Sequence, residues 1–452
     1  MVANEIRETL RLAVPITLAQ VALMTMGLVD AAMVGRVSAA ELAAVAMGNA
    51  LAFAMLCPAM GVTMAVEPLA SQAVGADDPD RAWLSLRAGV VACALLSIPT
   101  MLLMASSTVL LHVFGVDASV VPAAQRFILA RVPGAPAWLL FMAAKAYLEA
   151  RGVTRPLYVG GWVANVLNLV VCALLVFGDD ALARVGLPPL GLPRLGSLGA
   201  GLATSFSNIV LAAFALLMAW RIRPPGATAF GQGDELRLMT AKVIKVGVPI
   251  GMQILTEAGV FSCVGLLVGR LGPSATAAHQ IVLGLASFTF MGVLGISGAT
   301  SVRVGRAIGA REHGGPRVAG LVGVGLGIVY MVLCAGVFVL IPGPLARLFS
   351  DDPAVLATAI DVMRVAAAFQ IFDGIQGVAG GALRGAADTR FASLMNVVCH
   401  WGIGLPLAVL FGAVLGRGVV GYWWGLALGL LCVSVALASR FWRVSSRSIE
   451  AL

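Results

Sequence analysis

The chain contains few charged residues and no paired cysteines. Only 12% of its 452 residues are charged, whereas 60% are hydrophobic and the mean hydropathy is +0.97. A soluble domain normally carries about 25% charged residues, so this composition excludes a water-soluble protein of this size. The seven cysteines lie singly in apolar runs without any Cys-x-x-Cys spacing, which argues against a zinc site or a disulfide framework. The composition therefore indicates a protein that crosses a membrane several times.

Common catalytic and nucleotide-binding motifs are also missing. The sequence has no P-loop, no His-Glu-x-x-His and no Gly-x-Ser-x-Gly, and its four histidines are dispersed. A Gly-x-Gly-Asp pattern, as in intramembrane aspartyl proteases, occurs at 231–234, but in a polar stretch rather than in a span. We therefore expect no enzyme and no cofactor, and an intramembrane aspartyl protease stays a disfavoured alternative.

Twelve long apolar runs are separated by polar breaks rich in glycine and proline. A helix needs about 20 apolar residues to cross the hydrocarbon core, and β-barrel strands would be shorter and strictly alternating. The sequence therefore predicts an all-α polytopic membrane protein whose first run is an insertion signal rather than a cleaved leader. The predicted spans are 10–34, 43–69, 84–110, 121–147, 157–178, 196–220, 241–268, 277–301, 318–341, 354–382, 393–415 and 418–440.

The basic residues predict the orientation of these spans. With twelve spans, 21 of the 30 Lys and Arg residues fall on the side of the N-terminus, and nine, including Arg131, fall on the other. Cytoplasmic loops carry the excess of basic residues, so we expect both termini in the cytoplasm of a bacterial inner membrane. The net charge of +8 then serves orientation and contact with lipid head groups, and we expect no nucleic-acid partner.

The second half of the chain repeats the first. When the sequence is aligned with itself so that Val14 falls on Val248, the stretch from Val14 to Ala76 shows 15 identities in 63 positions. The identities include Val-Pro-Ile at 14–16 and Val-Gly-Arg at 34–36. Two six-span halves that enter from the same side form a parallel repeat, as in several transporters. We predict an N-terminal six-helix lobe at 1–222, a cytoplasmic linker at 223–237 and a C-terminal six-helix lobe at 238–452, in a monomer.

Three acidic residues lie deep inside predicted spans: Asp30, Glu257 and Asp373. A carboxylate in the bilayer centre costs roughly 2.5–3.5 kcal/mol on insertion scales, so such residues mainly persist where they bind something. The sequence places no Lys or Arg at their depth. We therefore interpret them as sites for a proton, Na⁺ or a cationic ligand. The internal repeat does not duplicate the three acids, which predicts different roles for the two lobes.

Polar residues accompany these acids at helical spacing. They are Gln20 near Asp30, Gln253 and Thr256 near Glu257, and Gln370 and Gln376 near Asp373. Amide, hydroxyl and carboxylate oxygens are ligands that a hard cation such as Na⁺ prefers.

Several motifs together resemble the MATE family of multidrug and toxin extrusion transporters, in its NorM-like branch. They are Leu12-Ala13-Val14-Pro15-Ile16, Gly27-Leu28-Val29-Asp30, Pro249-Ile250-Gly251 with Glu257, Ala278-His279-Gln280-Ile281, Arg303-Val304-Gly305, and Asp373 with Gln376 and Leu383-Arg384-Gly385. The resemblance implies two pseudo-symmetric lobes that form a V. It also implies a cation site at Glu257 and Asp373, with transient Na⁺ as one occupant, and a second coupling acid at Asp30.

The resemblance also extends to a polar substrate path, in which we include Asn168 and Gln280. In the fifth span the family commonly shows a second Asn or an Asp four residues after the first, but Cys172 stands there in this chain. Asn165, one turn earlier, is a candidate substitute. The completeness of the N-lobe site is therefore open at this point.

The predicted function is secondary active antiport by alternating access. The resemblance implies export of small organic cations or amphiphilic drugs in exchange for H⁺ or Na⁺, and the sequence does not decide between the two ions. A flippase for lipid-linked glycans is the alternative with the same architecture. Such a flippase would need inward-facing basic residues for phosphates, whereas the buried charges predicted here are acidic.

Overall fold

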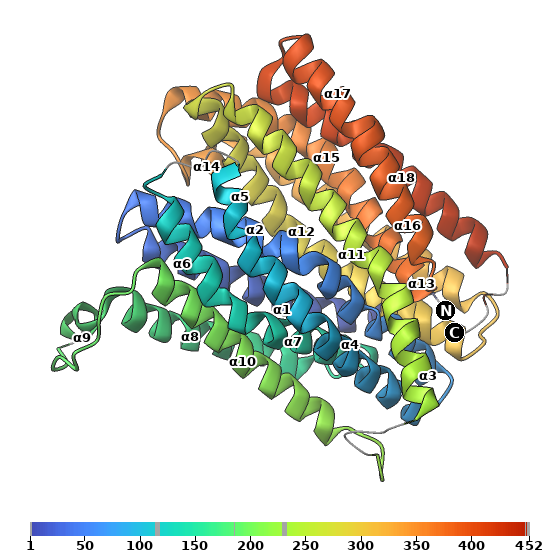
Figure 1. Ribbon diagram of the computed structural model, residues 1–452. Helices are drawn as coiled ribbons and strands as arrows, with labels where there is room; N and C mark the ends of the chain where they lie inside the picture. Colours follow the sequence, from blue (N-terminus) through green and yellow to red (C-terminus); the bar gives the residue numbers. More distant parts are fainter. Residues whose placement is uncertain (1, 114–117, 185, 228–232, 448, 450–452) are drawn as a thin grey trace. The chain divides into compact units, whose positions relative to one another are not determined.

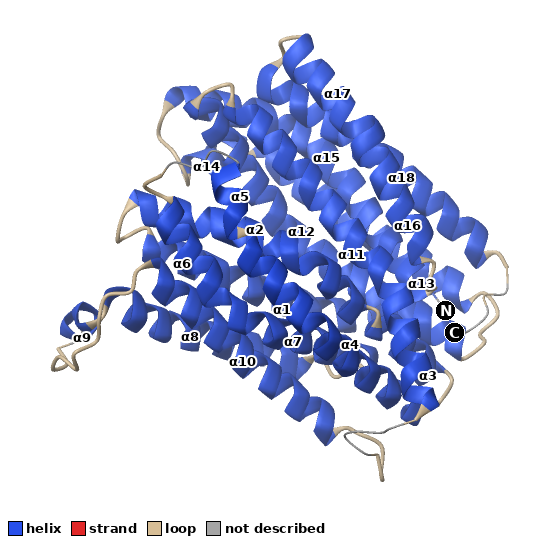
Figure 2. Cartoon of the chain, viewed as in Figure 1, coloured by secondary structure: helices blue, strands red, loops and turns tan. Residues whose placement is uncertain are grey.

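The computed structural model describes residues 2–113, 118–184, 186–227, 233–447 and 449 (Figure 1). Residues 228–232 of the predicted linker, with the first two positions of the Gly-x-Gly-Asp pattern, lie outside the described residues. Every regular element in the described part is a helix, and the remainder is loop (Figure 2). The structure therefore confirms the predicted all-α class.

Twelve helical stretches of the described chain are long and apolar enough to cross a membrane. They are Val2–Val34, Ala39–Gly75, Pro79–Leu111, Val121–Ala150, Arg155–Phe177, Ser197–Arg221, Asp234–Gly269, Pro273–Gly309, Gly315–Leu340, Pro353–Gly385, Thr389–Val414 and Gly418–Ser445. The predicted number of spans is confirmed. Many of the helices extend beyond the predicted runs, because hydropathy marks the apolar part of a helix and not its polar ends.

The chain divides into two compact units. Unit 1 consists of Met1–Thr17, Glu67–Asp78 and Met252–Leu452, and unit 2 consists of Leu18–Val66 and Pro79–Gly251. The lobe boundaries proposed from the sequence stay a prediction. The units show in addition that two short N-terminal segments pack with the C-terminal part of the chain.

Unit 2 contains the second part of α1 (Val2–Val34) and the first part of α11 (Asp234–Gly269). Its other elements are α2 (Ala39–Met64), α4 (Pro79–Ser106), α5 (Thr108–Val113), α6 (Val121–Arg131), η1 (Val132–Gly134), α7 (Ala135–Ala150), α8 (Arg155–Phe177), α9 (Asp179–Arg184) and α10 (Ser197–Arg221). Helix α2 begins at a cap, where the side chain of Ser38 accepts a hydrogen bond from the backbone of Glu41. One buried apolar cluster joins Phe127, Cys172 and Val176. Ala200 and Ala203 belong to the same cluster, so α10 packs against both α6 and α8.

Unit 1 contains the remaining parts of α1 and α11. Its other elements are α3 (Val66–Gly75), α12 (Pro273–Gly309), α13 (Gly315–Leu340), α14 (Pro342–Arg347), α15 (Pro353–Gly385), α16 (Thr389–Asn396), η2 (Val397–Gly404), α17 (Leu405–Val409), η3 (Leu410–Val414) and α18 (Gly418–Ser445). The segments η2 and η3 are π-helical. Helix α15 begins where Asp352 caps the helix and Pro353 occupies the first helical position. Its buried face packs against α12, α13 and α18.

The two repeats exchange the beginnings of their first helices. Helix α1 passes from unit 1 to unit 2 after Thr17, and α11 passes from unit 2 to unit 1 after Gly251, which is the repeat-related position. In unit 1, Gly295 of α12 lies directly against Thr17 of α1. In unit 2, the repeat-related Gly61 of α2 lies directly against Gly251 of α11. The internal repeat is therefore visible in matching helix contacts and not only in sequence.

Candidate functional site

The acidic site of unit 1 lies where α11 and α15 contact each other. Gln376 of α15 donates a hydrogen bond from Nε2 to Oε2 of Glu257 at 3.4 Å. One turn away, the side chain of Gln253 lies next to Gly380. Polar residues of the two spans therefore lie next to each other, and their role as a cation site stays a prediction.

Asp373 lies one turn from Gln376 on the same helix and is 6% exposed. It experiences the negative charge of Glu257, and neither carboxyl group has a basic residue within 4 Å in the described part of the chain. The fully buried Gln370 has no hydrogen-bond partner at either amide atom, and Oε1 of Gln376 also lacks one. Buried polar atoms without partners are rare in folded proteins. Two carboxyl groups and free amide oxygens can therefore accept a proton or ligate a small cation here.

Small residues on α15 hold Asp373 inside the unit. Ser297 of α12 donates its hydroxyl to the carbonyl of Gly377 at 2.7 Å, and Gly381 lies directly against the same serine. A side chain at Gly381 would push α12 away from α15. This close packing fixes the rotation of α15 and keeps Asp373 on its buried face.

Aromatic side chains form one border of the unit 1 site. Phe261, one turn beyond Glu257, lies 5.9 Å from Phe369, and Phe369 lies 5.2 Å from Trp423 between ring centroids. The indole Nε1 of Trp423 donates to Nδ1 of His279 at 3.1 Å, so the buried imidazole is held as an acceptor at that nitrogen. His279 thus belongs to the aromatic border.

A second tryptophan anchors the segment of α11 that carries Glu257. Trp401 lies in the π-helical segment η2 and donates from Nε1 to the backbone carbonyl of Thr256 at 3.0 Å, with its ring near Gly259. π-Helical turns are frequent at functional sites. Thr256, one of the predicted polar residues, donates its hydroxyl to the backbone carbonyl of Met252 at 2.6 Å.

Two predicted path residues are not joined to the acids. Gln280 of α12 is exposed, and Gln20 of α1 is half-buried. Among the described residues, neither makes a hydrogen bond to Asp30, Glu257 or Asp373. Their roles stay predictions.

The unit 2 site surrounds Asp30, which is 2% exposed. Asn168 of α8 donates to its Oδ1 at 2.7 Å, and Thr204 of α10 donates to its Oδ2 at 2.5 Å. Ser207 in turn donates to Oδ1 of Asn168 at 3.1 Å. Both carboxylate oxygens are therefore satisfied by side chains. The sequence prediction lacks Thr204 and Ser207, although the polar run Thr-Ser-Phe-Ser-Asn inside the sixth span is a signal that could have found them.

The two uncertain residues of α8 have different roles. Asn165 donates from Nδ2 to the carbonyls of Ala22 and Gly161, at 2.7 and 2.9 Å, so it ties α1 to α8 and does not replace the missing second residue at Asp30. The thiol of Cys172 interacts with Asp30 directly.

A basic residue accompanies Asp30, contrary to the sequence prediction. The count of basic residues places Arg131 in the non-cytoplasmic loops, but it ends α6 inside the fourth span. It interacts electrostatically with Asp30. The signal for this placement is the Pro133-Gly134 pair, which breaks the span directly after Arg131. The expectation that no basic residue lies near the three acids is therefore wrong for Asp30.

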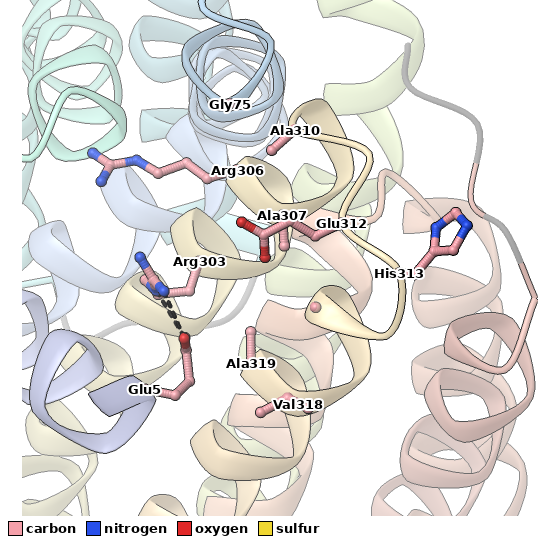
Figure 3. Close-up of a pocket in the computed structure, with 11 residues that line it drawn as sticks. Glu5, Gly75, Arg303, Arg306, Ala307, Ala310, Glu312, His313, Val318 and Ala319 are labelled. Atoms are coloured by element: carbon pink, nitrogen blue, oxygen red, sulfur yellow. Dashed lines mark hydrogen bonds and ion pairs between the residues drawn. The ribbon is translucent and has the colours of Figure 1, made fainter. Parts of the chain in front are cut away.

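A polar cavity of about 540 Å³ lies in unit 1 at the end of α12 (Figure 3). Arg303 and Glu5 point toward one another there and form two hydrogen bonds, of 2.7 and 2.5 Å, that join α12 to the start of α1. Glu312 and Arg306 also line the cavity. Arg303, which belongs to one of the motifs named in the sequence analysis, thus ties two helices together.

The architecture is that of a polytopic helical transporter with buried carboxyl groups, and comparisons with known proteins identify the family. The family model described as MatE matches residues 15–174 and 249–410, two segments that begin at repeat-related positions. The chain belongs to this family, and its relatives place it in the NorM-like branch. It is 36% identical to the probable multidrug resistance protein NorM of Pseudomonas putida, over 98% of this chain and 95% of the relative. It is 30% identical to the multidrug resistance protein NorM of Vibrio vulnificus, over 97% and 95%.

Solved structures share the fold. The crystal structure of the eukaryotic MATE transporter AtDTX14 superposes with a TM-score of 0.86 at 21% identity, over 97% of this chain and 96% of that one. An outward-facing multidrug resistance MATE transporter of the MOP superfamily gives a TM-score of 0.85 at 16% identity, over 98% and 96%.

Proposed function

We propose that this protein is a secondary active antiporter that exports organic compounds, mainly cations and amphiphilic drugs, in exchange for H⁺ or Na⁺. The observation that carries the proposal is the carboxyl pair of the half-buried Glu257 and the buried Asp373, which has no basic partner within 4 Å among the described residues. Such a pair is unfavourable unless a cation or protons occupy it. The names of the NorM relatives support drugs as cargo.

Coupling follows from competition for these acids. An ion that enters from outside occupies the pair, and substrate leaves either because it loses a ligand or because the helices that carry the acids rearrange. Exchange of one monovalent cation for one ion moves no net charge, so only the ion gradient drives it, at about 1.4 kcal/mol per tenfold difference. A neutral substrate would add about 2.3 kcal/mol per 100 mV of membrane potential.

We further propose that the protein lies in the inner membrane with both termini in the cytoplasm. Movement of the lobes 1–222 and 238–452 would open the substrate path to one side of the membrane and then to the other. The excess of basic residues on the terminal side supports this orientation. We further infer that the protein acts as a monomer in contact with anionic lipids.

Purified protein in liposomes provides the test. A pH gradient and a Na⁺ gradient are imposed separately, and uptake of a fluorescent organic cation is recorded together with ion movement. We expect one of the gradients to drive transport, and addition of substrate to release the coupling ion. Equal uptake with and without both gradients would overturn antiport.

A further inference from the structure

The fourth span is interrupted at a charged residue inside unit 2. Helix α6 ends at Arg131, a single 3₁₀ turn follows at Val132–Gly134, and α7 continues the span. Gly134 packs so closely on Ser205 of α10 that any side chain there would collide with it. Interrupted membrane helices commonly form ligand sites, since their ends bring polar groups to mid-membrane depth. Arg131 lies at this break and is half-buried, so part of its side chain stays accessible.

Neighbouring residues of α10 connect the interruption to Asp30. Ser205 donates its hydroxyl to the carbonyl of Ala130 at 2.7 Å, and Thr204 donates to Oδ2 of Asp30 at 2.5 Å. Arg131 directly follows Ala130 in the chain. Two adjacent positions of α10 thus hold the carboxylate and the backbone next to the guanidinium.

The guanidinium of Arg131 keeps most of its hydrogen-bonding capacity. It donates from Nη1 to Oδ1 of Asn49, and its Cζ lies 5.7 Å from the ring centroid of Phe127. In the described part of the chain it forms no ion pair within 4 Å. An arginine has five N–H donors in a planar fork that matches a carboxylate. A half-buried arginine that uses one donor is therefore equipped to receive an anion.

We propose that Arg131 forms an anion subsite in unit 2 that binds the carboxylate of zwitterionic amphiphiles, molecules that carry both a carboxylate and a positive charge. This inference rests on the proposed transport function and specifies its substrate class. A purely cationic substrate in unit 2 meets the positive charge of Arg131 as well as the negative charge of Asp30. A zwitterion can place its carboxylate near Arg131 and its positive group near Asp30. Both charges therefore attract it, whereas Arg131 repels a pure cation.

Two dyes that differ by one methyl ester separate these substrates. Rhodamine 110 carries a free carboxylate, and rhodamine 123 is its cationic methyl ester. Transport of both dyes is measured in liposomes that contain wild type, Arg131→Gln, Arg131→Lys or Arg126→Gln. Arg126 lies on the same helix and is exposed, paired with Glu41 at 3.7 Å, so its substitution removes an equal charge elsewhere.

We expect Arg131→Gln to reduce the rate of rhodamine 110 transport at least tenfold. Its rate of rhodamine 123 transport should be no less than half of the wild-type rate. Arg131→Lys should retain part of the rhodamine 110 transport, and Arg126→Gln should change neither dye. Equal loss of both dyes in Arg131→Gln, or wild-type transport of rhodamine 123 alone, would overturn the anion subsite while leaving the transport function intact. Transport of neither dye by wild type would instead count against the transport function, and the subsite would fall with it.

Discussion

The two units treat a buried carboxyl group in opposite ways. In unit 2, Asp30 receives hydrogen bonds from Asn168 and Thr204 and lies within the electrostatic reach of Arg131. In unit 1, Glu257 and Asp373 have no basic partner within 4 Å among the described residues and lie beside amide atoms that lack partners. A carboxylate that already accepts two side-chain hydrogen bonds depends less on a bare coupling ion, although it still attracts the positive group of a zwitterion. The comparison therefore favours ion coupling in unit 1 and substrate selection in unit 2.

The largest effect is expected for the carboxyl pair of unit 1. Asp373→Asn and Glu257→Gln should each reduce gradient-driven efflux to the level of empty liposomes, because the neutral amide no longer exchanges a proton or holds a cation. Efflux is measured with the fluorescent cation used above. Asp361→Asn is the matched control, since Asp361 lies on the same helix α15 but is exposed and paired with Arg364. Full activity of both site variants would remove the coupling role from unit 1.

A smaller effect, on stability, is expected when Asp30 loses the hydrogen bond that it accepts from Thr204. Thr204→Val keeps the shape of the side chain but leaves Oδ2 of the buried carboxylate without its hydroxyl partner. An unsatisfied buried acceptor costs about 1–3 kcal/mol, so thermal unfolding in detergent should occur at a lower temperature. Thr358→Val on α15 is the control, because this exposed threonine bonds only to its own helix. An unchanged melting temperature in Thr204→Val would show that Asp30 does not depend on this balance.

The ion pair at the cavity of unit 1 should contribute less. Glu5→Gln removes the charge from a pair with Arg303 in which both side chains are partly exposed, so solvent screening limits the loss of stability to about 1 kcal/mol. The loss should shrink as salt rises, since ions screen the pair. Unfolding is measured at two ionic strengths, with Asp361→Asn as an exposed pair that should change by less. A larger loss at high salt would contradict an electrostatic origin.

The smallest effect is expected at Asp179, a solvent-accessible carboxylate of unit 2 that accepts three backbone hydrogen bonds. Backbone hydrogen bonds from Leu192, Leu190 and Gly191 lower the pKa of Asp179 below its usual value. Because the folded pKa is lowered, the contribution to stability is fully present above the unfolded value of about 3.9 and is lost as the pH falls through the folded pKa. Hydrogen exchange of these three amides should therefore accelerate, relative to their intrinsic rates, only below that pH.

The control for this last experiment is Asp179→Asn. The variant lacks the titrating group, so the protection of the three amides should be weaker than in wild type and should not change with acidification in the same way. Identical acid dependence in both proteins would show that another group controls the loop.

The fold was largely predictable because membrane insertion depends on local hydropathy. The number of spans followed from the apolar runs. Helical spacing grouped Gln376 with Asp373, and the structure adds that Gln376 also donates to Glu257 of another span. The partners of Asp30 did not follow, since Thr204 is distant in the sequence and only tertiary packing brings it near. The sequence misplaces Arg131, because a count of basic residues treats each one as a loop residue and ignores a break inside a span.

The start of the first helix can reach its final packing only after much of the second half of the chain has been synthesised. Thr17 packs against Gly295, which belongs to the second half of the chain. At about 5–20 residues per second, synthesis of the intervening chain takes on the order of tens of seconds. During that time the start of the first helix lies in the membrane without its final neighbour. Cells that express the N-terminal half alone should therefore accumulate a product that is inserted in the membrane but incompletely packed. During synthesis of the full chain, quality-control proteases could cleave this part before its partner helix is made.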